Sequence, residues 1–498
     1  MVLYLLLLVP LFAAAGAFAA RRRGVMESVN LCAAALTCIL AVVLAASILK
    51  FGTVSAMSDL LYADALSSLV VLLVAFVYMA CAVYAVGYFR NDEMSKVFEE
   101  DVLGTVTIGK LREYYTLTPL FVSSMLLVAL SNNLGIMWVA IEGTTLASVF
   151  LVTFYGRANS LEAAWKYAII GGVGLSMALF GTILTYYSAH TVLGTETLAG
   201  LNWSVLVTKA SQFDQSTMRL AFILILLGYG TKAGIAPMHT WKPDAYSEAP
   251  VPVAAMLAAA MLNCALYGLL RFLILTSRCL GPDFGSQLLI VFGLLSMGIA
   301  VPFVIVQHSY RRILAYSSID HCGIMVLALG FGGPLGALGM MLHMTFHSVT
   351  KPLLFFCAGN IQQHLKTDQF RKVKGGLIHT MPISAALLLM TTLAVTGSPP
   401  FSLFQSEFTI LRAAFDGNHF VPALLLVIFL VAIFSGFMIH ISRMVLGPDP
   451  GLPHVENCEW QKYSIVGLAC IVIVMGFWIP APLYALIQGA ARIVRDVR

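Results

Sequence analysis

The chain has 498 residues, of which 59% are hydrophobic and only 11% are charged. Soluble domains carry about 25% charged residues, so this composition excludes a soluble globular protein. The net charge of +5 at pH 7 is small for this length and does not indicate a nucleic-acid-binding protein. Apolar runs of roughly 20 residues recur along the chain and predict a polytopic membrane protein.

In chain order, the apolar runs predict an all-α polytopic membrane protein with about 14 transmembrane helices. The first run is followed, not preceded, by positive charge at Arg21–Arg23, which predicts a retained helix rather than a signal peptide. The predicted spans are 2–19, 28–49, 65–88, 115–131, 134–155, 163–188, 218–237, 250–275, 286–306, 312–330, 335–359, 381–413, 420–446 and 463–488.

The distribution of positive charge predicts the orientation of these spans. With the N-terminus outside, Lys and Arg concentrate in the cytoplasmic loops, as membrane proteins prefer. Both termini are therefore predicted outside, and Lys232 and Lys351 are expected to be the only lysines deep within the membrane. The longest cytoplasmic loop, near 89–114, mixes charges and is expected to be an interfacial or docking segment.

Two predicted spans contain interruptions, "TKAGIAPMH" at 231–239 and "TGSPPFSLFQSE" at 396–407. Proline breaks the helical hydrogen-bond ladder, and backbone freed in this way must face protein or water. Broken helices at matching positions predict an inverted-repeat transporter, whereas ordinary proline kinks are the alternative. We therefore expect two inverted five-helix repeats, spans 4–8 and spans 9–13, with the breaks in spans 7 and 12.

These repeats divide the chain into four parts. The predicted parts are an N-terminal three-helix segment with its cytoplasmic loop (1–114), a first repeat (115–276), a second repeat (285–446) and a C-terminal helix (447–498).

Two ionisable residues in separate spans are expected to meet near the midplane. Glu142 lies about nine residues into span 5, and Lys232 lies about fourteen residues into span 7. A charge at the bilayer centre costs about 2.5–3.5 kcal/mol, so each residue calls for a partner or a role. The pair is either a static ion pair or a proton site in which the carboxylate controls the amine.

Span 11 carries His343, His347 and Lys351 at intervals of four residues, which places all three on one helix face. Imidazole exchanges protons near neutral pH, so this stripe predicts a proton relay. Packed polar residues are one alternative. A haem or metal site with His321 or His440 as a partner is another.

Glu407 follows the second break and is expected to be the last relay before the exit, or alternatively a solvated charge. The nine cysteines form no CxxC pair, and the chain contains neither GxxxxGK[ST] nor HExxH. No cofactor and no metal are therefore expected in this chain.

Four motifs resemble the antiporter-like, proton-conducting membrane subunits of respiratory complex I, Mrp-type sodium/proton antiporters and energy-converting nickel–iron hydrogenases. They are "GYGTKAGIAPMHTWKPDAYSEAPVPVAAMLAAAMLNCALYG", "RRILAYSSIDHCG", "HMTFHSVTKPLLFFCAGNI" and "TGSPPFSLFQSEFTIL". The resemblance covers roughly 115–445. It is strongest to component F of hydrogenase-4 and formate hydrogenlyase complexes.

The resemblance implies a role for each candidate residue. Glu142 and Lys232 match the coupling pair of the family, His343, His347 and Lys351 match its central relay, and Glu407 matches its terminal site. His239, Asp244, Glu248 and Asn263 are secondary candidates. The resemblance also implies a prokaryotic inner membrane, membrane-arm partner subunits and a separate redox module, with lipid but no nucleic acid as further partners.

The sequence departs from the family pattern at four places. Ala258 occupies the span 8 position that often holds histidine or lysine, so the bridge from Lys232 to span 11 is expected to be water or Asn263. Lys242 replaces the usual leucine, and Tyr246 replaces a frequent histidine. "QHSYRR" lacks the acidic residue that usually precedes the basic pair.

The sequence favours a proton-translocating subunit of a redox-driven complex, in which other subunits perform the redox chemistry. A sodium/proton antiporter subunit of the Mrp type and a structural scaffold that docks a hydrogenase remain as alternatives.

Overall fold

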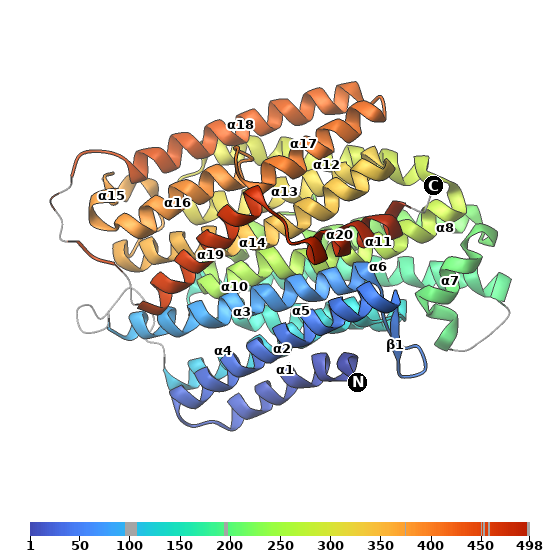
Figure 1. Cartoon of the computed structure of the whole chain (residues 1–498), viewed down its shortest axis with the longest axis horizontal. Helices are drawn as coiled ribbons and strands as arrows, with labels where there is room; N and C mark the ends of the chain where they lie inside the picture. Colours follow the sequence, from blue (N-terminus) through green and yellow to red (C-terminus); the bar gives the residue numbers. More distant parts are fainter. Residues whose placement is uncertain are drawn as a thin grey trace.

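The computed structural model describes residues 1–94, 107–193, 198–373, 375–449, 451, 454–456 and 459–495. In this part of the chain, long helices run side by side along the longest axis of the molecule, with α1 at one edge and α18 at the other (Figure 1). The predicted all-α membrane class is confirmed. Part of the proposed docking loop, 95–106, lies outside the described residues.

The helices follow the predicted spans closely. The N-terminal part contains α1 (Val2–Ala19), α2 (Arg23–Phe51) and α3 (Ala65–Met94). It also contains the hairpin β1 (Val54–Ala56) and β2 (Leu61–Ala63), which the sequence did not predict.

The first predicted repeat contains α4 (Ile108–Leu130), α5 (Leu134–Val152), α6 (Ala158–Leu193), η2 (Leu198–Leu201), α7 (Trp203–Lys209), η3 (Ala210–Gln212), α8 (Gln215–Ala233), α9 (Trp241–Glu248), α10 (Val251–Met256), η4 (Leu257–Met261) and α11 (Leu262–Leu280). The second contains α12 (Pro282–Val306), α13 (Tyr310–Phe331), α14 (Gly333–Leu365), η5 (Phe370–Lys372), α15 (Leu377–Thr380), α16 (Pro382–Val395), α17 (Ser402–Asp416) and α18 (Phe420–Val445). The C-terminal part contains α19 (Glu459–Phe477) and α20 (Ala481–Arg495).

Eleven helices within the described ranges are long and apolar enough to cross a membrane. Three further predicted spans correspond to α8, to α14 and to the α16–α17 pair, which do not meet that criterion. Polar residues in α8 and α14 and the break between α16 and α17 account for this difference. The count of fourteen spans, the inverted relation of the repeats and the four-part division stay predictions.

Both predicted breaks are present. α8 ends at Ala233, and Gly234 follows in the left-handed region at φ +80°, the usual conformation that stops a helix. α16 ends at Val395, and Gly397 adopts φ +67° before α17 begins at Ser402. Each break thus combines a glycine that leaves the helix with a proline that prevents it from continuing.

The single C-terminal helix predicted at 463–488 is wrong. The chain forms α19 and α20, with Trp478–Pro480 between them in non-helical conformation. Pro480 and Pro482 explain the interruption, because neither can donate the backbone hydrogen bond that would continue α19. The N-terminus and the end of α20 lie toward the same end of the bundle, in the right half of Figure 1.

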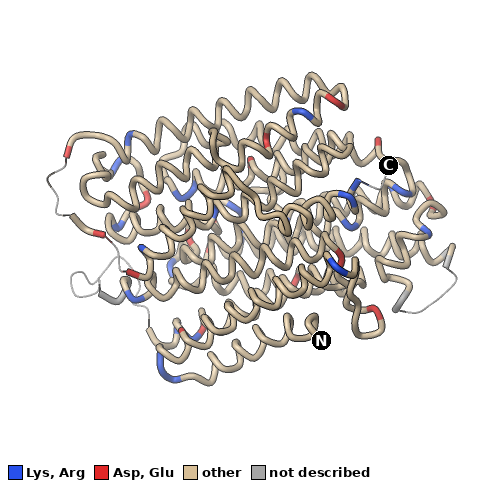
Figure 2. The backbone as a smooth tube through the Cα atoms, in the orientation of Figure 1, with Lys and Arg blue, Asp and Glu red and all other residues tan. Residues whose placement is uncertain are grey.

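The interior of the bundle is formed by α3, α10–α11, α13 and α14. The most apolar windows of 251–280 and 310–331 are wholly buried, whereas α18 turns most of its surface outward. Most charged residues lie toward the ends of the helices (Figure 2). Lys232, Lys242 and Lys351 are exceptions, each almost completely buried. Lys242 of α9 is thus buried in the protein like Lys232 and Lys351, and the expectation that the latter two alone lie deep within the membrane stays a prediction.

Candidate functional site

The first group of buried polar residues surrounds Lys232 at the end of α8. Its Nζ donates to Thr145 Oγ1 at 2.8 Å and to Tyr167 OH at 2.6 Å, and it lies 4.9 Å from the centroid of the Tyr167 ring. Glu142 lies one turn before Thr145 on α5, and its Oε2 has no hydrogen-bond partner in the described structure. The expected direct ion pair is not formed within 4.0 Å in the described residues; Thr145 and Tyr167 accept hydrogen bonds from the amine instead.

The side chains of Trp241 and His239 lie beside the break that follows α8. Trp241 Nε1 donates to Thr231 O at 2.9 Å, and its ring stacks on Tyr167 at 4.5 Å between centroids. His239 is 7% exposed, and its Nδ1 has no partner in the described part of the chain. The secondary candidate His239 therefore lies beside the broken backbone with a free nitrogen.

Asn263 connects α11 to the histidine-bearing helix α14. Its Nδ2 donates to Ser348 Oγ at 2.6 Å, and its Oδ1 is a buried acceptor without a donor in the described residues. Ala258 lies in η4, the π-helical turn that joins α10 to α11. Asn263 therefore reaches α14 from span 8, although Ala258 offers no polar group.

Lys351 forms the second buried amine site, between α14 and α13. Its Nζ donates to Ser317 Oγ at 2.7 Å and lies 3.4 Å from Leu314 O. Asp320 lies one turn beyond Ser317 on α13, buried, with Oδ1 unpartnered among the described residues. Sequence reasoning missed Asp320, although an aspartate inside an apolar span is itself a signal.

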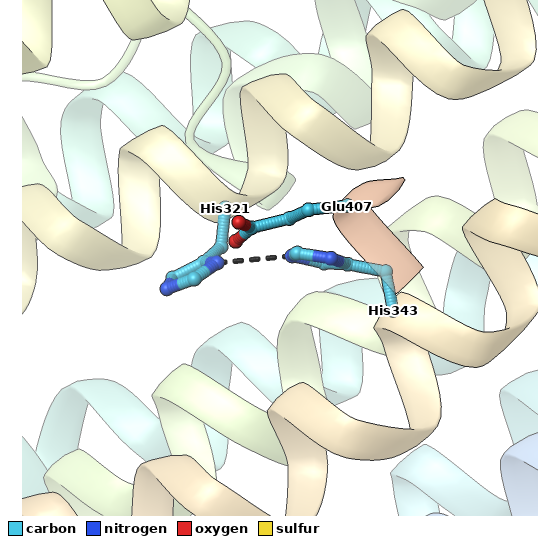
Figure 3. Close-up of side chains that lie close together, drawn as sticks. All are labelled: His321, His343 and Glu407. Carbon is cyan, nitrogen blue, oxygen red and sulfur yellow. Dashed lines mark hydrogen bonds between the residues drawn. The ribbon is translucent and has the colours of Figure 1, made fainter. Parts of the chain in front are cut away.

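The histidine cluster, made of His321, His343, His347 and Glu407, joins α13, α14 and α17. His321 Nδ1 lies 2.9 Å from His343 Nε2, and Figure 3 shows the two rings meeting beside the Glu407 carboxylate. His343 Nδ1 lies 3.0 Å from Ser406 Oγ. The ring of His347 lies 5.1 Å from that of His321, and neither of its nitrogens has a partner in the described part of the chain.

Glu407, on α17, directs its carboxylate toward the second break. It is 7% exposed, and its Oε1 has no hydrogen-bond partner in the described structure. A Cβ built on Gly397 would approach Glu407 Oε2 to 1.9 Å, so the carboxylate rests against the glycine of the break. The carboxylate is thus buried rather than exposed on the surface, and its role as the last relay stays a prediction.

Asp244 and Glu248 occupy one end of the bundle, on α9. Asp244 pairs with Lys166 at 2.9 Å and with Arg312. Glu248 lines a polar cavity of about 220 Å³ together with Arg311 and Asp368, and burial raises the pKa of the Glu248 carboxyl. Asp244 therefore belongs to an ion-pair network, and Glu248 belongs to the lining of this cavity.

The histidine cluster contains a donor set that suits a small divalent ion. One ligand atom each of His321, His343 and Glu407 lies within 4.8 Å of the others. A haem iron between His321 and His343 does not fit, because two metal–nitrogen bonds of about 2.0–2.1 Å on opposite faces exceed the 2.9 Å between the nitrogens. His440 binds Ile305 O at 2.9 Å and stacks on Phe370 instead.

Comparison with known proteins identifies the family of the chain. A family described as NADH:quinone oxidoreductase/Mrp antiporter, TM, matches residues 131–439. A hydrogenase-4 component F homolog from Methylacidiphilum infernorum is 39% identical over 388 residues, which cover 78% of this chain and 79% of the relative. One subunit of a Na(+)/H(+) antiporter from Alkalihalophilus pseudofirmus is 27% identical over 378 residues, 74% of each chain.

A solved structure has the same fold. A chain of the membrane-bound sulfane sulfur reductase, an archaeal respiratory membrane complex, superposes with a TM-score of 0.85 at 23% identity, over 100% of this chain and 98% of the other. The family match includes Glu142, Lys232, the histidine cluster and both breaks. The chain therefore belongs to the NADH:quinone oxidoreductase/Mrp antiporter transmembrane family.

Proposed function

We propose that the chain is the proton-translocating membrane subunit of a redox-driven complex of the hydrogenase type. One observation carries this proposal: Lys232, Lys351 and the histidine cluster lie buried, with no carboxylate within 4.0 Å of either amine in the described residues. A protein that needed only stability would replace such groups with apolar side chains, because buried charge without a counter-ion is costly.

The geometry supports a path across the bundle. A proton reaches Lys232 from the side of His239, and Glu142 controls how strongly the amine holds it. It crosses to α14, passes Lys351 and His347, and reaches His321 and His343, whose nitrogens are 2.9 Å apart. Glu407 receives it at the second break. Water must complete the steps between these groups.

The 39% identity to a hydrogenase-4 component F homolog supports the type of complex. On this proposal the redox reaction belongs to partner subunits, and this chain supplies the membrane arm in a prokaryotic inner membrane. Both termini then face outward, in agreement with the excess of Lys and Arg in the loops at the opposite end.

The test uses the purified full chain in liposomes with a potassium diffusion potential and an internal pH dye. Wild-type protein is expected to carry protons inward. Lys232→Met should lower the flux by about 100-fold, the usual size of a lost acid–base group. The exposed Lys209→Met is the matched control and should leave the flux unchanged. Normal flux in Lys232→Met would contradict the path.

Sodium transport is the second candidate, supported by the similarity to a Na(+)/H(+) antiporter component. Uptake of radioactive sodium driven by a pH gradient, without any redox donor, would favour it over the first proposal. If the wild-type protein carries neither protons nor sodium ions, a structural scaffold is the candidate function that remains.

A further inference from the structure

Lys242 is a buried amine for which the path described above has no role. It lies in the first turn of α9 and is 0% exposed. Its Nζ donates to Ala233 O at 2.6 Å and lies 3.5 Å from Ser318 O. The first carbonyl ends the broken helix α8, and the second belongs to α13 of the other predicted repeat. Lys242 therefore touches both halves of the bundle.

No carboxylate neutralises Lys242. In the described residues it forms no ion pair within 4.0 Å, and the centroid of the Tyr246 ring lies 5.7 Å from its Nζ. The partial negative charge at the end of α8 offsets only part of the cost of a buried ammonium. An apolar side chain would fill this position without the free-energy cost of burying a charge, so the presence of the amine suggests a function.

The two carbonyls that Lys242 contacts adjoin the two lysines of the path. Ala233 follows Lys232 directly in the chain. Ser318 follows Ser317, whose hydroxyl accepts a hydrogen bond from Lys351 at 2.7 Å. Lys242 thus contacts the backbone next to Lys232 on α8 and the backbone next to Ser317, a partner of Lys351, on α13.

The neighbouring residue on α9 faces the first of these sites. Trp241 stacks on Tyr167, the phenol that accepts a hydrogen bond from Lys232. α9 therefore contacts Tyr167, the partner of Lys232, through Trp241. Through Lys242 it reaches toward the Lys351 site. Both contacts depend on the position of α9, so the two residues are placed together.

We propose that Lys242 is the bridging residue that connects the Lys232 site to the Lys351 site. The neutral amine takes up a proton delivered through water from the Lys232 side, and the ammonium so formed releases it through water toward Lys351. Span 8 offers no titratable group for this task, because Ala258, in η4, has no polar side chain and the amide of Asn263 does not take up a proton. The inference rests on the proposed proton transport.

A structural role makes a different prediction. If Lys242 only caps the end of α8, any side chain that donates to Ala233 O should suffice. Glutamine keeps an N–H donor and cannot carry a proton, whereas methionine keeps the approximate shape and removes the donor. The two substitutions therefore separate capping from proton transfer.

The experiment measures proton flux in liposomes for Lys242→Gln and Lys242→Met, with the folded fraction determined by size-exclusion chromatography. Both variants should fold and lose flux by about 100-fold, the size of a lost acid–base group. Adding Ala258→Lys to either variant should restore flux, since it returns an amine to the centre from span 8. A capping role predicts no such rescue, because a lysine on span 8 does not replace the cap of α8.

Other outcomes overturn the inference. Wild-type flux in Lys242→Gln would assign Lys242 to capping alone. Failure of Ala258→Lys to restore any flux would contradict the bridging role, because an amine returned to the centre of the bundle would then not be sufficient. If Lys242→Met does not fold, the proton flux of Lys242→Gln is compared with that of the Lys242→Gln, Ala258→Lys double variant. That comparison then tests the bridging role. Absence of flux in the wild-type chain, by contrast, would contradict the proposed function itself.

Discussion

Unpartnered polar atoms are the most informative feature at the scale of single residues. Glu142, Asp320, His347 and Glu407 each bury an oxygen or nitrogen without a hydrogen-bond partner in the described part of the chain. Buried polar groups are nearly always hydrogen-bonded in proteins, so such a concentration needs an explanation. On the proposed function, water along the proton path would be the partner of these atoms.

The His321–His343–Glu407 arrangement predicts that a borderline divalent ion competes with protons for the path. Co²⁺ added to the purified wild-type chain should give the visible absorption of a tetrahedral site with nitrogen and oxygen ligands, and it should inhibit proton flux. His321→Asn and Glu407→Gln should each abolish the spectrum. His440→Asn, which alters a histidine bound to Ile305 O, is the matched control.

Two results would contradict this prediction. A cobalt spectrum that persists in His321→Asn would place the ion elsewhere, and inhibition without a spectrum would show that the cluster is not the binding site.

The residues of the site divide into those that sequence predicts and those that it does not. Lys232, His343, His347 and Lys351 are visible because an ionisable residue in an apolar span is rare. Thr145 and Tyr167, the hydrogen-bond partners of Lys232, are ordinary residues of their own helices. Their role depends on the packing of α6 against α5 and α8, which no local pattern encodes.

At the scale of elements, the break between α16 and α17 holds Glu407 in place, and this can be tested at Gly397. A methyl group there would collide with Glu407 Oε2, at 1.9 Å from the built Cβ, and would strain the backbone at φ +67°. Gly397→Ala should therefore lower proton flux strongly although every titratable group is kept. Left-handed backbone costs an L-residue about 1–2 kcal/mol, so stability should also fall.

Gly52→Ala separates the two effects. Gly52 has φ +83°, yet a Cβ there meets nothing within 4 Å. This variant should lose similar stability in thermal unfolding and keep its flux. Equal fluxes in both variants would show that the position of Glu407 does not matter.

Glycine and proline make some breaks predictable and leave others hidden. The interruptions at Gly234 and Gly397 were expected because each combines these residues with polar neighbours. The third interruption, between α19 and α20, was missed because "GFWIPAPLYAL" keeps its hydrophobic character through the prolines. The β1–β2 hairpin was missed because six residues of strand give no periodic signal.

At the scale of the whole molecule, α3 connects the N-terminal segment to both predicted repeats. Asp64, directly before α3, binds Arg271 of α11 with two hydrogen bonds of 2.8 Å. Near the other end of α3, Tyr84 donates to Asn360 of α14 at 2.8 Å and stacks on Phe356. Residues so distant in the chain cannot be paired from one sequence, so the central position of α3 was not predicted.

The buried Asp64–Arg271 pair predicts how strongly this connection contributes to stability. Arg271 also contacts Ser67 Oγ at 2.9 Å and lies 4.1 Å from the Trp203 ring centroid, which leaves it almost no access to solvent. Removing one partner of a buried pair costs about 3–5 kcal/mol because the other charge stays buried. Asp64→Asn and Arg271→Met should each lower the free energy of unfolding by about that amount.

The double variant decides whether the loss comes from the pair. Because removing both charges leaves neither uncompensated, Asp64→Asn with Arg271→Met should cost clearly less than the sum of the single variants. Unfolding in mixed micelles, followed by tryptophan fluorescence, measures all three. Glu162→Gln, which breaks the exposed pair with Lys166, is the control and should change little. Additive losses would show that α3 is held by apolar packing and not by this pair.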